Sequence, residues 1–142
     1  MRYTSGMQIS LETNHEHYAI LGYTPGLLTL VQPRRVEAPS TVEERKKMVS
    51  TSCILMPGYM SDTWPPQTFD DLTAEHFAAL LALKPELVVL GTGAKLRFPK
   101  PDRLAPLINQ GIGVEVMDTP AACRTYNFLM VDGRNVLAAL LL

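Results

Sequence analysis

The chain has 142 residues, of which 46% are hydrophobic and 19% are charged, and this balance predicts one globular domain over residues 1–142 and excludes a disordered chain. The 13 basic and 14 acidic residues leave a net charge of −1. That near-neutral balance argues against nucleic acid as the main partner, because phosphate backbones are bound through accumulated positive charge.

The two ends of the chain bear on its location. Residues 1–6 are followed by neither an apolar signal core nor an Arg-rich transit pattern, so we expect a cytoplasmic protein. The longest apolar run, residues 136–142, is far shorter than the roughly 20 residues that a membrane-spanning helix needs. It predicts a buried strand, and its hydrophobicity also raises the possibility of a homodimer.

The first third of the chain is typical of β-structure. Apolar residues alternate over residues 7–11, and two further apolar stretches cover residues 18–21 and 27–31. Between the last two, Pro25 fixes φ and Gly26 supplies a positive φ, which together indicate a tight turn. We therefore predict an antiparallel β-hairpin layer within residues 1–36.

Strands and helices alternate over residues 48–142. A strand over residues 49–56 is closed by Pro57-Gly58, and a long loop is expected over residues 59–71. Thr73 is the expected N-cap of a helix that stops at Pro85. The apolar run at residues 87–90 predicts a strand covered on both faces, ended by Gly91-Thr92-Gly93.

The pattern continues with a helix between Pro101 and Gln110, in which Pro106 is tolerable only in the first turn. A strand follows over residues 113–117. Asp118 then provides an N-cap, with Pro120 at the start of a further helix. Residues 128–141 allow two interpretations: the helix continues past residue 128, or Asp132-Gly133 turns a hairpin. We favour the hairpin.

This order of elements predicts an α/β fold, a three-layer single domain. A central mixed, mostly parallel sheet is flanked by helices, and the N-terminal hairpin layer is added to it.

Candidate functional residues follow the strands, because ligands of open α/β sheets bind beyond the carboxyl ends of the parallel strands. We expect Pro57-Gly58-Tyr59, residues 91–93 and the start of the last helix to converge there. Free helix N-terminal N–H groups, with Arg124 nearby, would favour a small acidic or phosphorylated ligand. The candidate ligand-binding residues are Gly91, Thr92, Gly93, Asp118, Thr119, Arg124, Thr125 and Asn127.

The motif itself is weak. Gly91-Thr92-Gly93 lacks the third glycine of a dinucleotide fingerprint, and its glycines are also explained by a tight turn alone. We assign no catalytic residue; Asp118, the only general base near the strand ends, is a weak candidate. We predict no cofactor.

Cysteines and histidines offer little further chemistry. Cys123, beside Arg124, invites a catalytic interpretation, but we favour buried hydrophobic roles for both Cys53 and Cys123. His15 and His17 lack an evident third ligand, so no metal site is expected.

Three more features have surface interpretations. The mixed-charge run at residues 43–47 is expected to be a solvated segment. His76 is expected to be a surface or capping residue. Tyr59 and Trp64 either form a contact surface on their Pro-rich loop or pack back against the sheet.

Three stretches, residues 91–93, residues 111–119 (Gly-Ile-Gly-Val-Glu-Val-Met-Asp-Thr) and Ala122 with residues 125–127 (Thr-Tyr-Asn), resemble domain-of-unknown-function family four-nine-eight, which has the MTH-nine-three-eight-like fold. The resemblance implies one α/β domain with a mixed central sheet and an added hairpin layer. It also implies kinship with a mitochondrial branch that assists assembly of respiratory complex I and with an animal branch linked to adipocyte development. We expect this chain to be one of the bacterial members, most of which have no assigned activity.

Two functions compete. The first is an interaction or assembly module that binds a protein partner and a small ligand at the strand ends; the resemblance implies a respiratory or membrane-associated assembly as that partner. It is favoured because no complete set of nucleophile, base and orienting residue is evident. The second is an enzyme that acts on a small acidic metabolite, positioned by Thr92, Thr119, Arg124 and Asn127.

Overall fold

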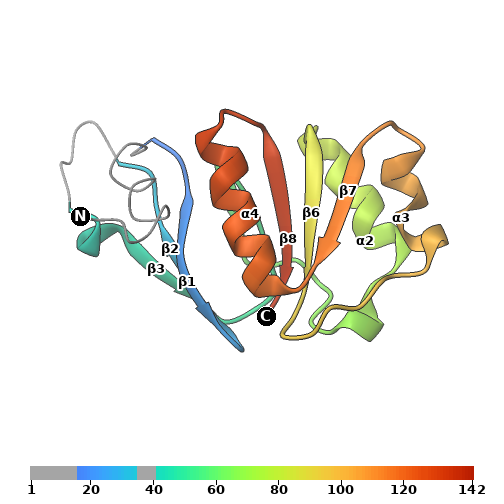
Figure 1. Cartoon of the computed structure of the whole chain (residues 1–142), viewed down its shortest axis with the longest axis horizontal. Helices are drawn as coiled ribbons and strands as arrows, with labels where there is room; N and C mark the ends of the chain where they lie inside the picture. The colour runs from blue at the N-terminus through green and yellow to red at the C-terminus, as the bar shows by residue number, and fades with distance from the viewer. Residues whose placement is uncertain (1–15, 35–40) are drawn as a thin grey trace.

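The structure is a computed structural model that describes residues 16–34 and 41–142 (Figure 1). The strand expected over residues 7–11 and the residue His15 lie outside these ranges. The described residues form two sheets, and helix α4 (Thr119–Val131) packs between the small sheet and one face of the large one. The predicted α/β class, with a mixed sheet between helices and an antiparallel layer, is confirmed.

The small sheet has the order β1-β2-β3 and is antiparallel throughout. Its strands are β1 (Ala19–Thr24), β2 (Leu27–Val31) and β3 (Lys46–Val49). The predicted turn between the first two is present, with Gly26 at a φ of 84°. A positive φ of this kind is open to glycine without steric cost, so this turn is encoded locally.

The single strand predicted over residues 49–56 is wrong. Its first residue ends β3 of the small sheet, whereas Cys53–Met56 forms β4 of the large sheet. The chain crosses between the sheets at residues 50–52, a polar Ser-Thr-Ser stretch, where the Ser52 N–H donates to the side chain of Gln67.

The charged run at residues 43–47, which leads into β3, is solvated only in part: Glu43 and Glu44 are exposed, but the run is not wholly the solvated segment that was expected. Glu43–Arg45 forms a 3-10 helix, η1, and Arg45 is buried. Its guanidinium donates to the carbonyl oxygens of Thr41 and Gln32. Arg45 therefore joins the segment before β3 to the end of β2.

The large sheet has the order β5-β4-β8-β6-β7. Besides β4 it contains β5 (Tyr59–Ser61), β6 (Leu87–Thr92), β7 (Gly113–Met117) and β8 (Val136–Leu141). Strand β6 is parallel to β7 and β8, whereas β4 is antiparallel to β5 and β8. The loop expected at residues 59–71 therefore begins with a strand, because Pro57-Gly58 turns a tight hairpin between β4 and β5.

Helices α2 (Ala74–Ala78) and α3 (Pro101–Ile108) cover the other face of the large sheet, opposite α4 (Figure 1). Thr73 caps α2 as predicted, and His76 completes the cap because its Nδ1 accepts the Thr73 N–H at 3.1 Å. A 3-10 turn, η3 (Ala79–Leu83), extends α2 as far as Lys84, which adopts a positive φ just before Pro85.

Trp64 reaches this face from the loop after β5. It is buried and contacts Phe77 and His76 edge to face, so its part of the loop packs back on the sheet. A further 3-10 turn, η2 (Phe69–Asp71), follows in the same loop. Tyr59 instead remains 43% exposed.

Pro106 lies in the second turn of α3, not in the first turn that was expected. It lacks an N–H to donate to the carbonyl of Asp102, four residues earlier. Asp102 is exposed, so water can satisfy that carbonyl. The helix therefore tolerates the proline, and it ends only two residues later.

The hairpin favoured for residues 128–141 is wrong, because α4 continues to Val131 and β8 follows. Gly133, at a φ of 83°, ends the helix. Its N–H donates to the carbonyl of Met130 and the next N–H, of Arg134, donates to the carbonyl of Leu129. This is the Schellman arrangement, in which a glycine that resembles a hairpin turn in the sequence serves as a helix stop.

Strand β8 is central in the large sheet, and all six of its residues are buried. Both of its edges pair within the chain, with β4 and with β6. Its continuous hydrophobicity is thus explained by its position in the sheet. In the described part of the chain, no helix has both the length and the apolar character needed to cross a bilayer.

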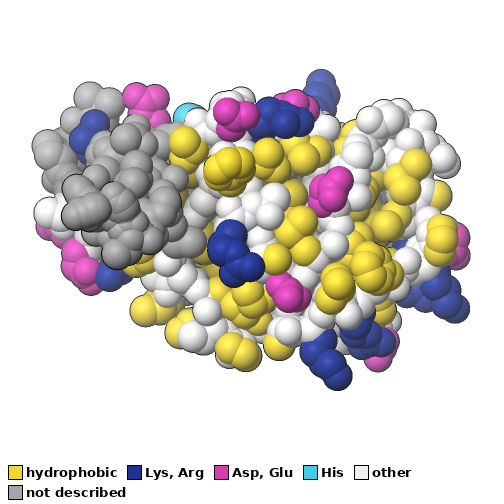
Figure 2. Space-filling model, viewed as in Figure 1, with side chains coloured by type: hydrophobic (Ala, Val, Ile, Leu, Met, Phe, Trp, Pro, Cys, Tyr) yellow, Lys and Arg dark blue, Asp and Glu magenta, His cyan; other side chains and the backbone are white. Residues whose placement is uncertain are grey.

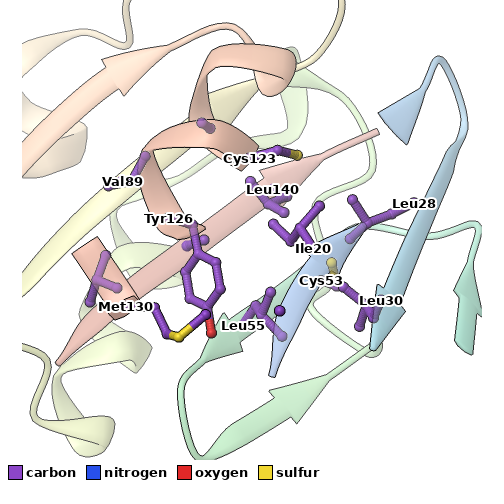
Figure 3. Close-up of a cluster of buried hydrophobic side chains, with 14 of the residues drawn as sticks. Ile20, Leu28, Leu30, Cys53, Leu55, Val89, Cys123, Tyr126, Met130 and Leu140 are labelled. Carbon is purple, nitrogen blue, oxygen red and sulfur yellow. The ribbon is translucent and has the colours of Figure 1, made fainter. Parts of the chain in front are cut away.

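The core has one cluster on each face of the large sheet. Figure 3 shows the cluster beneath α4, where Tyr126 and Met130 from the helix meet Ile20 of β1 and Leu55 of β4. The small sheet is therefore joined to the rest of the molecule through α4 and β4.

Candidate functional site

The carboxyl ends of β6 and β7 lie side by side, and the chain leaves them toward opposite faces of the sheet. Strand β6 leads to α3 on one face and β7 leads to α4 on the other (Figure 1). This is the reversal point at which open α/β sheets usually hold ligands. The structure brings residues 91–93 and Asp118-Thr119 together there, as the sequence predicts.

The two connections are bonded directly to each other. The Thr119 N–H donates to the carbonyl of Gly93 at 2.8 Å, and the Gly93 N–H donates to the Thr119 hydroxyl at 2.8 Å. That hydroxyl donates in turn to the carbonyl of Leu141, at the end of β8, at 2.6 Å. The fully buried Thr119 side chain therefore ties three strand ends together.

Gly91 is needed for this close packing. A Cβ at this position would lie 2.8 Å from the Thr119 hydroxyl oxygen, 3.0 Å from Leu140 and 3.1 Å from Ala122. The space over Gly91 is filled by these side chains, so α4 can approach β6 only over a residue without a side chain.

Thr92 organises the loop that leaves β6. Its buried hydroxyl donates to the carbonyl of Lys95 at 2.6 Å and accepts the N–H of Arg97 at 3.2 Å. It also lies 3.3 Å from the carbonyl of Met117. The hydroxyls of Thr92 and Thr119, two of the three proposed for ligand binding, are thus engaged inside the protein.

The N-terminal turn of α4 is similarly satisfied. Thr119 donates its N–H to Gly93, Pro120 has none, and Ala121 donates to the Asp118 carboxylate at 2.9 Å. The next N–H, of Ala122, donates to the Asp118 carbonyl. The groups that would attract an anion at a helix N-terminus are therefore occupied by the chain itself.

The remaining predicted residues lie further along α4. Thr125 donates to the Met117 sulfur at 3.3 Å. Asn127 is buried and faces β1, where its side chain accepts the N–H of Ile20 at 2.9 Å and donates to its carbonyl at 2.7 Å. Arg124 is exposed on the outer surface of the helix. Asn127 is thus directed away from the strand ends, toward the small sheet.

Pro57-Gly58-Tyr59 does not join this site, which corrects the expected convergence of three segments. Because β4 is antiparallel to β8, the end of β4 lies beside the start of β8, at the opposite end of the strands from the candidate site. The sequence identified a strand there but carried no signal for its direction.

Both cysteines are buried in the cluster beneath α4 (Figure 3). Burial raises the pKa of the Cys53 thiol to about 12, and it raises the pKa of the Cys123 thiol to about 12 despite the opposing effect of Arg124. Neutral thiols of this kind are poor nucleophiles. The preferred interpretation, that both are small core residues, agrees with their burial.

The sequence interpretation missed the exposed apolar side chains. Phe98 is 70% exposed and Leu96 is 51% exposed, both in the loop between β6 and α3. On α4, Phe128 is 79% exposed. The alternation Lys-Leu-Arg-Phe at residues 95–98 was an available signal, because it falls in a segment with no predicted element to bury its apolar members.

The chain is similar to curated assembly factors and to solved bacterial domains. It is 42% identical over 91 residues, 63% of its length, to mouse "NADH dehydrogenase [ubiquinone] 1 alpha subcomplex assembly factor 3". The match covers 49% of that protein, so the chain spans about half the length of the curated relatives it matches.

Two solved structures share the fold. A Bordetella parapertussis protein is 32% identical with a TM-score of 0.71, over 89% of this chain and 96% of that one. A Mth938-like domain from Bordetella pertussis is 27% identical with a TM-score of 0.64, over 99% of this chain and 92% of that one. A family model matches residues 22–141, and the chain therefore belongs to the family described as "Protein of unknown function (DUF498/DUF598)".

Proposed function

We propose that this chain is a protein-binding module that assists the assembly of a respiratory NADH dehydrogenase. The observation that carries the proposal is its 42% identity over 91 residues to an assembly factor for that enzyme. The geometry supports a binding role, because the Thr92 and Thr119 hydroxyls at the strand ends are bonded to the chain's own backbone. A pocket and a positioned set of reactive groups are what an enzyme would need there.

The outer face of α4 is the surface we assign to the partner. The inner face is buried against both sheets, whereas Arg124, Phe128 and Val131 project outward at helical spacing. Phe128 and Val131 are 79% and 43% exposed. Figure 2 shows hydrophobic and cationic side chains exposed together over this helix. Aromatic residues and arginine are the side chains that most often dominate binding at protein interfaces.

The test is complementation of a deletion in the native host. We expect loss of the gene to lower the amount of assembled NADH dehydrogenase on native gels, and the wild-type chain to restore it. Phe128→Ser should fail to restore assembly while keeping the melting temperature of the wild type, because the substituted side chain is exposed. Met48→Ser is the matched control, since Met48 is 63% exposed on β3 of the small sheet.

Normal assembly in the deletion strain would overturn the proposed function. Restoration by Phe128→Ser as complete as that by Met48→Ser would overturn the assignment of the α4 face alone.

A small-anion site is a finer proposal that the sequence motivates. Because the polar groups at the strand ends are bonded within the chain, the exposed Arg124 is the group that would hold the anion. Native mass spectrometry of the freshly purified chain tests it, with a retained acidic ligand as the expected result and loss of that ligand in Arg124→Gln. A bare chain mass would contradict it. The same spectra report the oligomeric state, for which the sequence leaves a homodimer open, and fractionation of host cells tests the predicted cytoplasmic location.

A further inference from the structure

We propose that the loop between β6 and α3, residues 94–100, docks the protein onto an anionic lipid surface. We call this segment the 94–100 loop. It runs along the lower right of Figure 1, from the end of β6 to the start of α3. The proposal goes beyond the assembly role, because it concerns a different surface and a different class of partner.

The first observation is exposure. Residues 94–98 are all exposed in succession, and they include Leu96 at 51% and Phe98 at 70%. Isolated exposed apolar residues are ordinary, but two large ones, two residues apart on one exposed stretch, favour contact with another apolar phase.

The second observation is charge. Lys95, Arg97 and Lys100 lie in the loop, which contains no acidic residue and so carries +3. Since the whole chain has a net charge of −1, the rest of the molecule carries −4. Figure 2 shows Lys and Arg side chains beside hydrophobic ones along the lower right of the molecule. The loop is thus a local cationic and apolar surface on a mildly acidic protein.

The third observation is that contacts with the rest of the protein fix the loop in place. The Thr92 hydroxyl fixes its first turn through Lys95 and Arg97. The Arg97 guanidinium lies 4.2 Å above the Phe69 ring and 3.3 Å from the Asp70 carboxylate. Pro99 is buried between the exposed Phe98 and Lys100. The apolar tips are therefore displayed on a fixed base, which lowers the entropic cost of docking.

The chemistry favours lipid over protein as the occupant. Lys95 and Lys100 form no ion pair with any described residue, whereas Arg97 is engaged by Asp70. Protein interfaces are enriched in arginine and depleted of lysine. At a bilayer surface, by contrast, lysine stems lie along the apolar boundary while their ammonium groups reach anionic headgroups. Leu96 and Phe98 would enter the acyl boundary between them.

The experiment is co-sedimentation of the full chain with vesicles. One set contains phosphatidylcholine alone and the other contains equal parts of phosphatidylcholine and phosphatidylglycerol. We expect binding to the anionic vesicles that weakens as salt is raised, because exposed charge attraction is screened. Lys95→Gln/Lys100→Gln should lower this partitioning roughly tenfold or more. Leu96→Ser/Phe98→Ser should lower it by at least about tenfold.

Met48→Ser is the matched control, because it removes an equally exposed apolar side chain from the small sheet, at the other end of the molecule (Figure 1). Melting curves of all variants establish that they are folded. Equal binding to neutral and anionic vesicles, no binding to either, or unchanged binding by both loop variants would overturn the proposal. If the loop variants fail in the assembly test but bind anionic vesicles as the wild type does, the loop contacts a protein and the lipid proposal is wrong. The α4 variant Phe128→Ser tests the assembly role separately.

Discussion

At Gly91, α4 approaches β6 so closely that no side chain fits between them. We expect Gly91→Ala to lower the free energy of unfolding by about 1–3 kcal/mol, as overpacking of a tight core does. The Thr119 hydroxyl that would meet the new methyl group, at 2.8 Å, cannot move aside without breaking its bonds to Gly93 and Leu141. Urea denaturation measures the change.

Gly113→Ala is the control for that measurement. Gly113 lies in the adjacent strand β7 without a positive φ, and a Cβ there would meet nothing within 4 Å. Its substitution should change the unfolding free energy by less than about 1 kcal/mol, or stabilise the protein. Equal losses in the two variants would mean that contact with Thr119 is not what excludes a side chain at position 91.

The two thiols make stability sensitive to alkaline pH. In both Cys53 and Cys123 burial raises the pKa to about 12, above the ordinary value of 9.0. The folded state thus keeps protons that the unfolded chain releases, so their contribution is complete below about pH 9 and is lost as pH rises toward 12. Each thiol should lower the unfolding free energy by up to ~1.4 kcal/mol per pH unit in this window.

Urea titrations at pH 8, 9 and 10 test this slope, because these pH values bracket the ordinary thiol pKa of 9.0. Cys123→Ala should keep about half of the slope that the two thiols supply, since Cys53 remains. A slope unchanged in the variant would show that Cys123 ionises as readily in the folded as in the unfolded state.

Among the elements, α4 depends on how its C-terminus is ended. Gly133 adopts a φ of 83° and its N–H caps the carbonyl of Met130. We expect Gly133→Ala to lower the unfolding free energy by about 1 kcal/mol, because an L side chain is strained at this φ. Gly58→Ala is the control, since Gly58 has no positive φ and open space at its Cβ. A loss as large in Gly58→Ala would remove strain at Gly133 as the explanation.

The contrast between Gly26 and Gly133 explains how far the sequence predicts the elements. Pro25-Gly26 specifies its turn by local sterics, and the hairpin follows. Asp132-Gly133 has equally clear local chemistry, but a positive-φ glycine serves a helix end and a hairpin alike. The choice between a helix end and a hairpin depends on whether the following strand, β8, pairs with β4 and β6. Those partners are distant in the sequence, so the local pattern does not reveal them.

Strand direction limits the candidate site in the same way. The sequence correctly placed Gly91 and Thr119 together, because β6 and β7 are joined by a helix and must be parallel. It placed Pro57-Gly58 with them only by assuming that β4 is parallel too. It also could not show that Thr92 and Thr119 bond to backbone, because a side chain's partners come from packing across the sheet.

At the scale of the whole molecule, the small sheet is held to α4 and to the end of the chain after β8 by a few specific bonds. The Asn127 side chain bonds to both the N–H and the carbonyl of Ile20. The Tyr126 hydroxyl donates to the carbonyl of Tyr18 at 2.8 Å. At the far end of β1, the Tyr23 hydroxyl and the Gly26 N–H both donate to the carbonyl of Leu142. Two anchor points, one at each end of β1, thus join the small sheet to the large unit.

These anchors predict where the molecule opens first. Asn127→Ala leaves the N–H and carbonyl of Ile20 buried without the amide, at a cost of about 1–3 kcal/mol. The loss falls on the contact between α4 and β1, whereas β6 and β8 keep all their ladder bonds. We therefore expect faster hydrogen exchange in peptides covering residues 18–31 and unchanged exchange in those covering β6 and β8, because local opening follows the weakened contact.

Asn109→Ala is the matched control, since Asn109 is exposed at the end of α3 and its side chain holds no strand. It should leave both sets of peptides unchanged. If Asn127→Ala instead speeds exchange equally in both sheets, the molecule opens only as a whole. The small sheet would then be a part of one cooperative unit, and its docking through Asn127 would contribute to global stability without a separate opening step.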